Sequence, residues 1–160
     1  MVFVGIAYRG GRGLACVMAA LILQACSFAG SGPPGGHFSQ FGAAAPDGDT
    51  VTVCSAHGCK VQHSFTFSRA DLWEMENIMR STVRSSSPVD ERRGIAKTLA
   101  WIEKKVGPAT GTASDRAGID FSAGGDPSQQ DCVDEATNAT AYMMVMQRHG
   151  LIRLHEVVAP

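Results

Sequence analysis

The feature that constrains this fold most is a pair of β-branched segments around a short turn, with a cysteine on each side of it. Residues 50–54 alternate polar and apolar β-branched side chains and end in Cys54, a pattern typical of a strand. Residues 55–58 favour a turn, and residues 59–67 return with Cys59, His63 and Phe67 on one face. The sequence therefore predicts a β-hairpin that carries Cys54 and Cys59 at its turn.

The N-terminus carries the pattern of an export signal. Arg9 and Arg12 precede an apolar run from Leu14 to Leu23, which is shorter than the roughly 20 residues that a membrane-spanning helix needs. The sequence Leu-Gln-Ala-Cys at 23–26 resembles the bacterial lipobox, which implies cleavage before Cys26 and a lipid on its thiol. Residues 1–25 are therefore expected to be a signal peptide of the lipoprotein type. A plain signal cut nearby, with Cys26 incidental, is the alternative.

The predicted export of the protein determines the expected oxidation state of the two hairpin cysteines. Paired thiols in an oxidising compartment normally form a disulfide, so a structural Cys54–Cys59 bond is expected. The alternatives are a redox pair or a metal pair with His57 or His63. Redox motifs favour two intervening residues, and zinc needs further ligands that the sequence does not offer. We therefore predict the disulfide and no metal site.

Composition divides the rest of the chain. Residues 26–49 include a Gly- and Pro-rich run at 30–36 and are expected to be a flexible tether, with His37 solvated. Residues 50–160 are long enough for one domain. The formal net charge of −1 gives no indication of nucleic-acid binding.

Helical periodicity begins after the hairpin. Ser68 to Asp71 resembles a capping box, and Leu72, Met75 and Met79 follow at helical spacing, with Trp73 beside them and assigned to the core. A second helix is expected to begin at Ser87-Pro88 and to stop at Gly107-Pro108. Its basic residues are expected to form a solvated face: Arg92, Arg93, Lys97, Lys104 and Lys105.

A long loop separates these helices from the last one. Residues 107–130 show no periodicity apart from a short piece at 118–121, and such loops are usually functional or mobile. A final helix is predicted from Asp131 to His149, with Cys132 at the start of its buried face, and a strand from Leu151 to Val158. The whole is an α+β fold: a disulfide-bearing hairpin, two helices, a long loop, and a Cys-led helix followed by a strand.

Cys132 is the candidate nucleophile, since Cys26 and the hairpin cysteines have other predicted roles. A helix N-terminus favours the thiolate, whereas the neighbouring Asp131, Asp134 and Glu135 oppose it. A catalytic thiol also needs a base. His149 lies about 25 Å away along the same helix, so His155 on the following strand is the candidate. The alternative is a packed, unreactive Cys132.

The motif around Cys132 also carries a resemblance. Asp-Cys-Val-Asp-Glu-Ala at 131–136 is similar to the nucleophile segment of bacterial transglutaminase-like cysteine proteinases. The chain from Val53 to Val157 resembles a group of uncharacterised bacterial proteins, through Cys54 to Cys59 and three further stretches, at 101–108, 131–138 and 150–155. The resemblance implies a Cys-led helix on an antiparallel sheet, with triad His and Asp strands beyond it. The chain ends before such strands, so we expect an inactive or C-terminally incomplete domain.

Two functions remain open from the sequence. The first is a cell-envelope lipoprotein that binds a protein or peptidoglycan partner without catalysis or a cofactor. The second is a transglutaminase-like thiol hydrolase or acyltransferase that uses Cys132 and His155. Ser27, where an aspartate would indicate inner-membrane retention, favours the outer membrane by resemblance.

Overall fold

The computed structural model describes residues 32–116, 122 and 124–160. Its elements, in chain order, are α1 (Gly35–Gln40), β1 (Thr50–Ser55), β2 (Val61–Thr66), α2 (Arg69–Thr82), α3 (Pro88–Thr110) and α4 (Cys132–Arg148). The predicted signal peptide, Cys26 and the predicted ordered piece at 118–121 lie outside the described residues. Within the described ranges, no helix combines the length and the apolar character needed to cross a bilayer.

The predicted hairpin is confirmed. β1 pairs with β2 in antiparallel register, with Thr50 opposite Thr66 and Ser55 opposite Val61. The Cys54–Cys59 disulfide closes the turn between the strands. The hydroxyls of Thr50 and Thr66 lie 2.8 Å apart across the open end of the hairpin. The hairpin is therefore tied at both ends, covalently at the turn and by a hydrogen bond at the other end.

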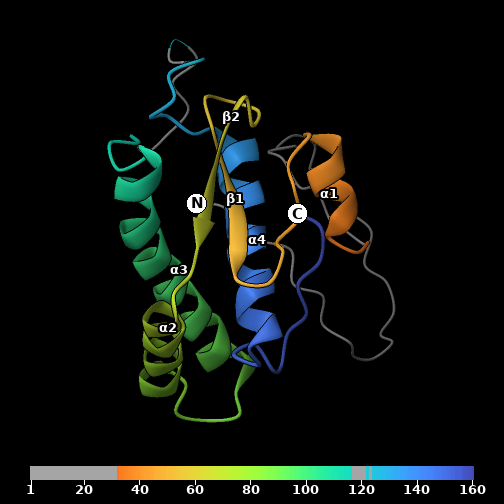
Figure 1. Ribbon diagram of the computed structural model, residues 1–160. Helices are drawn as coiled ribbons and strands as arrows, with labels where there is room; N and C mark the ends of the chain where they lie inside the picture. The colour runs from red at the N-terminus through yellow and green to blue at the C-terminus, as the bar shows by residue number, and fades with distance from the viewer. Residues whose placement is uncertain (1–31, 117–121, 123) are drawn as a thin grey trace, which may run out of the picture.

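α4 lies behind the hairpin, α3 and α2 extend this helical layer to the left, and α1 lies apart to the right (Figure 1). β1 lies against α4, β2 lies beside α3, and α2 packs on α3. The core lies between the layers, where strand and helix side chains bury apolar surface. Its most buried members include Val51, Val53, Met75, Ile102, Tyr142, Val145 and Met146. The α+β class is thus confirmed, with a two-stranded sheet among the described residues.

Local signals placed the starts of the two middle helices correctly. Ser68 Oγ accepts the N–H of Asp71, and the Asp71 carboxylate accepts the N–H of Ser68, which completes the predicted capping box. α3 begins after Ser87, with Pro88 in its first turn. The predicted stop at Gly107-Pro108 is wrong, because α3 continues to Thr110 and ends where Gly111 adopts a φ of 83°.

Part of the predicted tether is folded. α1 begins at Gly35, and Phe38 is only 1% exposed. His37, predicted to be solvated, has its Nε2 2.8 Å from the hydroxyl of Thr137 on α4. Phe38 therefore anchors α1 in the core, so the expectation of a flexible tether does not hold for this part of residues 26–49.

The predicted strand from Leu151 to Val158 is also wrong. These residues have no strand geometry. The Glu91 carboxylate accepts the backbone N–H groups of Arg153 and Leu154 at 2.7 and 2.8 Å, and Gln147 accepts that of Val157. Side chains of α3 and α4 thus satisfy donors that a neighbouring strand would otherwise have paired.

Candidate functional site

Cys132 is the first residue of α4, and its thiol is exposed. Asp131 caps the helix by accepting the N–H groups of Val133 and Asp134, at 3.1 and 3.0 Å. The prediction that Cys132 starts the buried face is therefore wrong. That face starts two residues later, at the fully buried Asp134, and continues through Thr137, Asn138 and Ala141.

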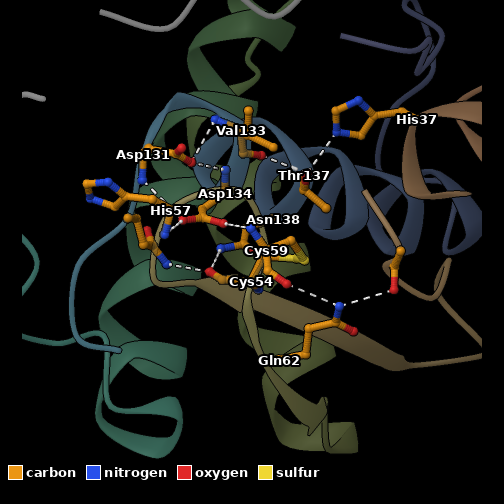
Figure 2. The surroundings of a disulfide bond; sticks show 12 residues. His37, Cys54, His57, Cys59, Gln62, Asp131, Val133, Asp134, Thr137 and Asn138 are labelled. Atoms are coloured by element: carbon orange, nitrogen blue, oxygen red, sulfur yellow. Dashed lines mark hydrogen bonds between the residues drawn. A yellow bond between two sulfur atoms is a disulfide. The ribbon is translucent and has the colours of Figure 1, made fainter. Parts of the chain in front are cut away.

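The polar groups on this face are buried because they hold the hairpin turn (Figure 2). The Asp134 carboxylate accepts the N–H groups of His57 and Cys59, at 2.9 and 2.6 Å. Asn138 pairs with both backbone groups of Cys54, accepting its N–H at 2.7 Å and donating to its C=O at 2.9 Å. The start of α4 is thereby fixed on the disulfide turn.

The turn itself has an unusual backbone. Ala56, His57, Gly58 and Cys59 all have positive φ angles, between 61° and 75°. Each non-glycine residue in this region costs about 1 kcal/mol or more, so the three non-glycine residues of this turn need external support. The disulfide and the Asp134 carboxylate supply it, and the N–H of Ala56 also donates to the Gln129 carbonyl at 2.8 Å.

Acidic groups dominate the electrostatics at this end of α4. Burial, and then the neighbouring Asp131, raise the pKa of Asp134. Burial and the charge of Asp115 raise the pKa of Glu135. Loss of hydration, with the charges of Glu135 and Asp115, raises the pKa of Glu103 to about 7, although that side chain still reaches solvent. Negative neighbours of this kind disfavour a thiolate at Cys132.

The structure does not bring His155 to Cys132. The His155 side chain is 6% exposed, and its Nδ1 lies 2.7 Å from the Glu91 carboxylate at the start of α3. The same segment is fixed to the C-terminal end of α4, where Val157 binds Gln147. Fifteen residues of helix separate Cys132 from Gln147, which is about 22 Å. A Cys132–His155 pair therefore has no support in the geometry.

The fold places His57 at the Cys132 end of α4. Its backbone N–H binds Asp134, and its imidazole extends outward beside Asp131, the residue before Cys132 (Figure 2). The sequence pattern pointed to His57 only as a partner of the hairpin cysteines. The position of His57 inside the Cys54–Cys59 loop was the only sign in the sequence that connected it with a site. The residues that His57 contacts become clear only when the turn packs on α4.

A groove of about 750 Å³ lies at the opposite end of the helical layer, between α2 and the segment after α4. Leu72, Met79 and Leu151 contribute apolar surface to it. Trp73 also lines the groove and is 63% exposed, so its assignment to the core is wrong. Met75 and Met79 are buried as predicted. The basic residues of α3 are exposed as predicted, and Lys105 pairs with Asp71 at 2.9 Å.

Two arginines line the groove without an acidic partner among the described residues, Arg69 on α2 and Arg153 on the C-terminal segment. Its acidic residues are already engaged, because Glu76 pairs with Arg80, and Glu91 holds the C-terminal segment. The groove therefore combines apolar surface, an exposed indole and two guanidinium groups that have no acidic ion-pair partner among the described residues.

In the part of the chain that the structure describes, no three His, Cys, Asp or Glu side chains are placed to hold a metal ion. The site is thus described by two separate features: the Cys132 end of α4, and the Trp73 groove.

The chain matches no protein-family model, no curated protein and no solved structure.

Proposed function

We propose that the chain is an exported, lipid-anchored domain that binds peptidoglycan in the Trp73 groove and catalyses no reaction on it. The observation that carries this proposal is the groove itself, with an exposed Trp73 one helical turn from Arg69 and with Arg153 contributed by the C-terminal segment. The export signal and the lipobox-like sequence that ends at Cys26 support an envelope location.

The charge of the groove selects an anionic ligand. Arg69 and Arg153 are exposed, and the two acids of the groove make their contacts with other groups, Glu76 with Arg80 and Glu91 with backbone N–H groups and His155. A guanidinium binds a carboxylate through two parallel hydrogen bonds, which gives geometric selectivity as well as attraction. Peptidoglycan carries carboxylates on its peptides, so its charge is complementary to that of the groove.

The indole adds selectivity for sugar rings. Trp73 is among the few large apolar side chains that the described surface exposes. A flat indole face is well suited to stacking on the flat C–H face of a pyranose, and exposed Trp and Arg together are typical of binding hot spots. A polymer that presents sugar rings beside carboxylates matches both features.

The arrangement of the candidate catalytic residues supports binding without catalysis. His155 is engaged with Glu91 at one end of the helical layer, whereas Cys132 lies at the other end. A thiol nucleophile needs a base within hydrogen-bond reach.

The test is co-sedimentation of the protein with purified peptidoglycan sacculi. We expect Trp73→Ala and Arg69→Glu each to weaken retention about tenfold, equivalent to roughly 1.4 kcal/mol. Lys97→Glu is the matched control, because it makes the same charge change at an exposed site on α3, outside the groove. Equal losses for Arg69→Glu and Lys97→Glu would mean that the groove is not the site. An absence of retention by the unmodified protein would exclude the function.

A second candidate function is thiol chemistry at Cys132, as the resemblance to transglutaminase-like proteinases implies. The exposure of the thiol at the start of a helix favours it, and His57 is then the candidate base. Iodoacetamide alkylation measured against pH, with peptide mass spectrometry, tests it. Rapid alkylation well below the reference pKa of about 8.5, slowed by His57→Ala, would support it. A thiol that reacts only after unfolding would exclude it.

A further inference from the structure

The two outer edges of the β1–β2 hairpin differ in how their backbone groups are satisfied. On β1, Cys54 is bonded through both its N–H and its C=O to Asn138, and Thr50 exchanges two hydrogen bonds with Asp47. In an antiparallel pair, residues whose groups point outward alternate with residues bonded to the partner strand. The residues of β1 whose backbone groups point outward are therefore Thr50, Thr52 and Cys54. Hydrogen bonds within the protein already satisfy the outward groups of Thr50 and Cys54.

The same alternation fixes the outward set on β2. Thr66, Ser64 and Gln62 lie opposite Thr50, Thr52 and Cys54, so their N–H and C=O groups point away from β1. Among the described residues, no group accepts from or donates to these backbone atoms. All three residues are exposed, so their outward backbone groups form an open edge of β2.

Proteins normally protect such an edge with a charge, a proline or a bulge. β2 reads Val-Gln-His-Ser-Phe-Thr, with no lysine, acidic residue, proline or glycine within it, and its register with β1 is continuous. An open edge accepts another extended strand, because main-chain hydrogen bonds then replace those to water. The chemistry of the edge therefore specifies the occupant as a β-strand.

We propose that this strand is β2 of a second copy of the chain, so that two hairpins form one continuous four-stranded antiparallel sheet. The outward residues are symmetric about Ser64. A two-fold axis there pairs Ser64 with Ser64 of the second copy and Gln62 with Thr66, which satisfies every outward backbone group on both strands.

The side chains are compatible with this register. It places the half-buried Phe65 opposite His63 of the second copy, so that two aromatic rings meet on the inner face. The other face pairs Ser64 with itself and Gln62 with Thr66. Because β2 has no formally charged residue, two identical strands meet without like charges opposite each other.

Cross-linking tests the register directly. In the full chain with Cys16, Cys26 and Cys132 replaced by serine, Ser64→Cys should form an intermolecular disulfide under mild oxidation. Ser81→Cys is the matched control, since Ser81 on α2 is also an exposed serine. A cross-linked dimer from Ser64→Cys alone supports the proposal. Equal cross-linking of both variants, or of neither, overturns it.

Sedimentation of the chain without a new cysteine tests the association itself. We expect a concentration-dependent dimer that Ser64→Lys abolishes, because it places two ammonium groups opposite each other. Ser81→Lys should leave the dimer unchanged. An intact Cys54–Cys59 disulfide and unchanged far-ultraviolet dichroism will show that Ser64→Lys still folds. A chain that stays monomeric at every concentration excludes self-pairing, as does a dimer that persists in Ser64→Lys.

Discussion

At the scale of single residues, Asp134 connects the most strained part of the backbone to α4. Its carboxylate accepts two N–H groups of the left-handed turn, and it is fully buried. Asp134→Ala leaves those donors unpaired, so we expect the free energy of unfolding to fall by about 2 to 4 kcal/mol in urea titrations. Glu135→Gln, one residue along the helix, is the control and should change it little. A loss below about 0.5 kcal/mol for Asp134→Ala would contradict this role.

Glu103 gives the protein a predictable dependence on pH. Its pKa is about 7 in the folded protein against an ordinary value of 4.5, so the folded state holds a proton that the unfolded state has released between these values. The stability that this group contributes is therefore complete below about pH 4.5 and is lost as the pH rises through about 7. We expect Glu103→Gln to be more stable at pH 8, by about 1 kcal/mol because solvent screens the side chain, and equal at pH 4. Thermal unfolding at both pH values, with Glu156→Gln as control, checks the sign.

The sequence predicts some of these residues and not others, depending on how far apart their partners lie. Cys54 and Cys59 are five positions apart, so a hairpin pattern and the predicted export signal were enough to pair them. Asp134 meets His57 and Cys59 across 77 and 75 positions. Helical periodicity treats such an aspartate as a solvent-facing residue, which is why Cys132 was wrongly assigned to the buried face. Buried polar residues that satisfy a distant backbone cannot be recognised by spacing.

At the scale of elements, helix starts were predicted better than helix ends. The starts at Ser68 and Ser87 depend on side chains within three positions of the cap. The end of α3 depends on tertiary packing. A Cβ on Gly107 would lie 3.1 Å from the Ala113 Cα, so the missing side chain lets the following chain fold back against the helix. Gly107-Pro108 therefore marks a close approach near the end of α3 and does not stop the helix.

The close packing of α2 on α3 gives a prediction at the same scale. A Cβ on Gly94 would lie 2.7 Å from the Val83 Cγ2 and 3.0 Å from the Met79 Sδ. Gly94→Leu must push the two helices apart, so we expect the free energy of unfolding to fall by about 3 kcal/mol in urea titrations. Gly36→Leu on α1, where a Cβ meets nothing within 4 Å, is the control. Similar effects at the two sites would show that α2 and α3 are loosely packed.

At the scale of the whole molecule, the C-terminal segment connects the fold to the proposed binding surface. The sequence predicted a strand here from its apolar pattern, and the apolar contacts are real, because Ile152 and Val157 are buried. The missing strand follows from hydrogen bonding, since Glu91 and Gln147 accept the N–H groups that a ladder would have used. Side chains of α3 and α4 therefore hold residues 151–157 in place. This segment, called the C-terminal strap below, forms one wall of the Trp73 groove.

Replacing Glu91 should release this strap and leave the rest of the domain folded. Glu91→Gln keeps the shape but turns an amide donor toward the N–H of Leu154 or Arg153, so one half-buried donor loses its acceptor. Hydrogen exchange measured by mass spectrometry should then rise at residues 151–157 and stay unchanged in the disulfide hairpin. Retention on sacculi should fall with it, because Arg153 loses its fixed position.

Asp90→Asn is the control. It removes only the exposed pairs of Asp90 with Arg93 and Ser85 and should alter neither measurement. If the strap loosens while retention stays the same, the C-terminal wall is not part of the binding surface, and Trp73 and Arg69 on α2 must account for it alone.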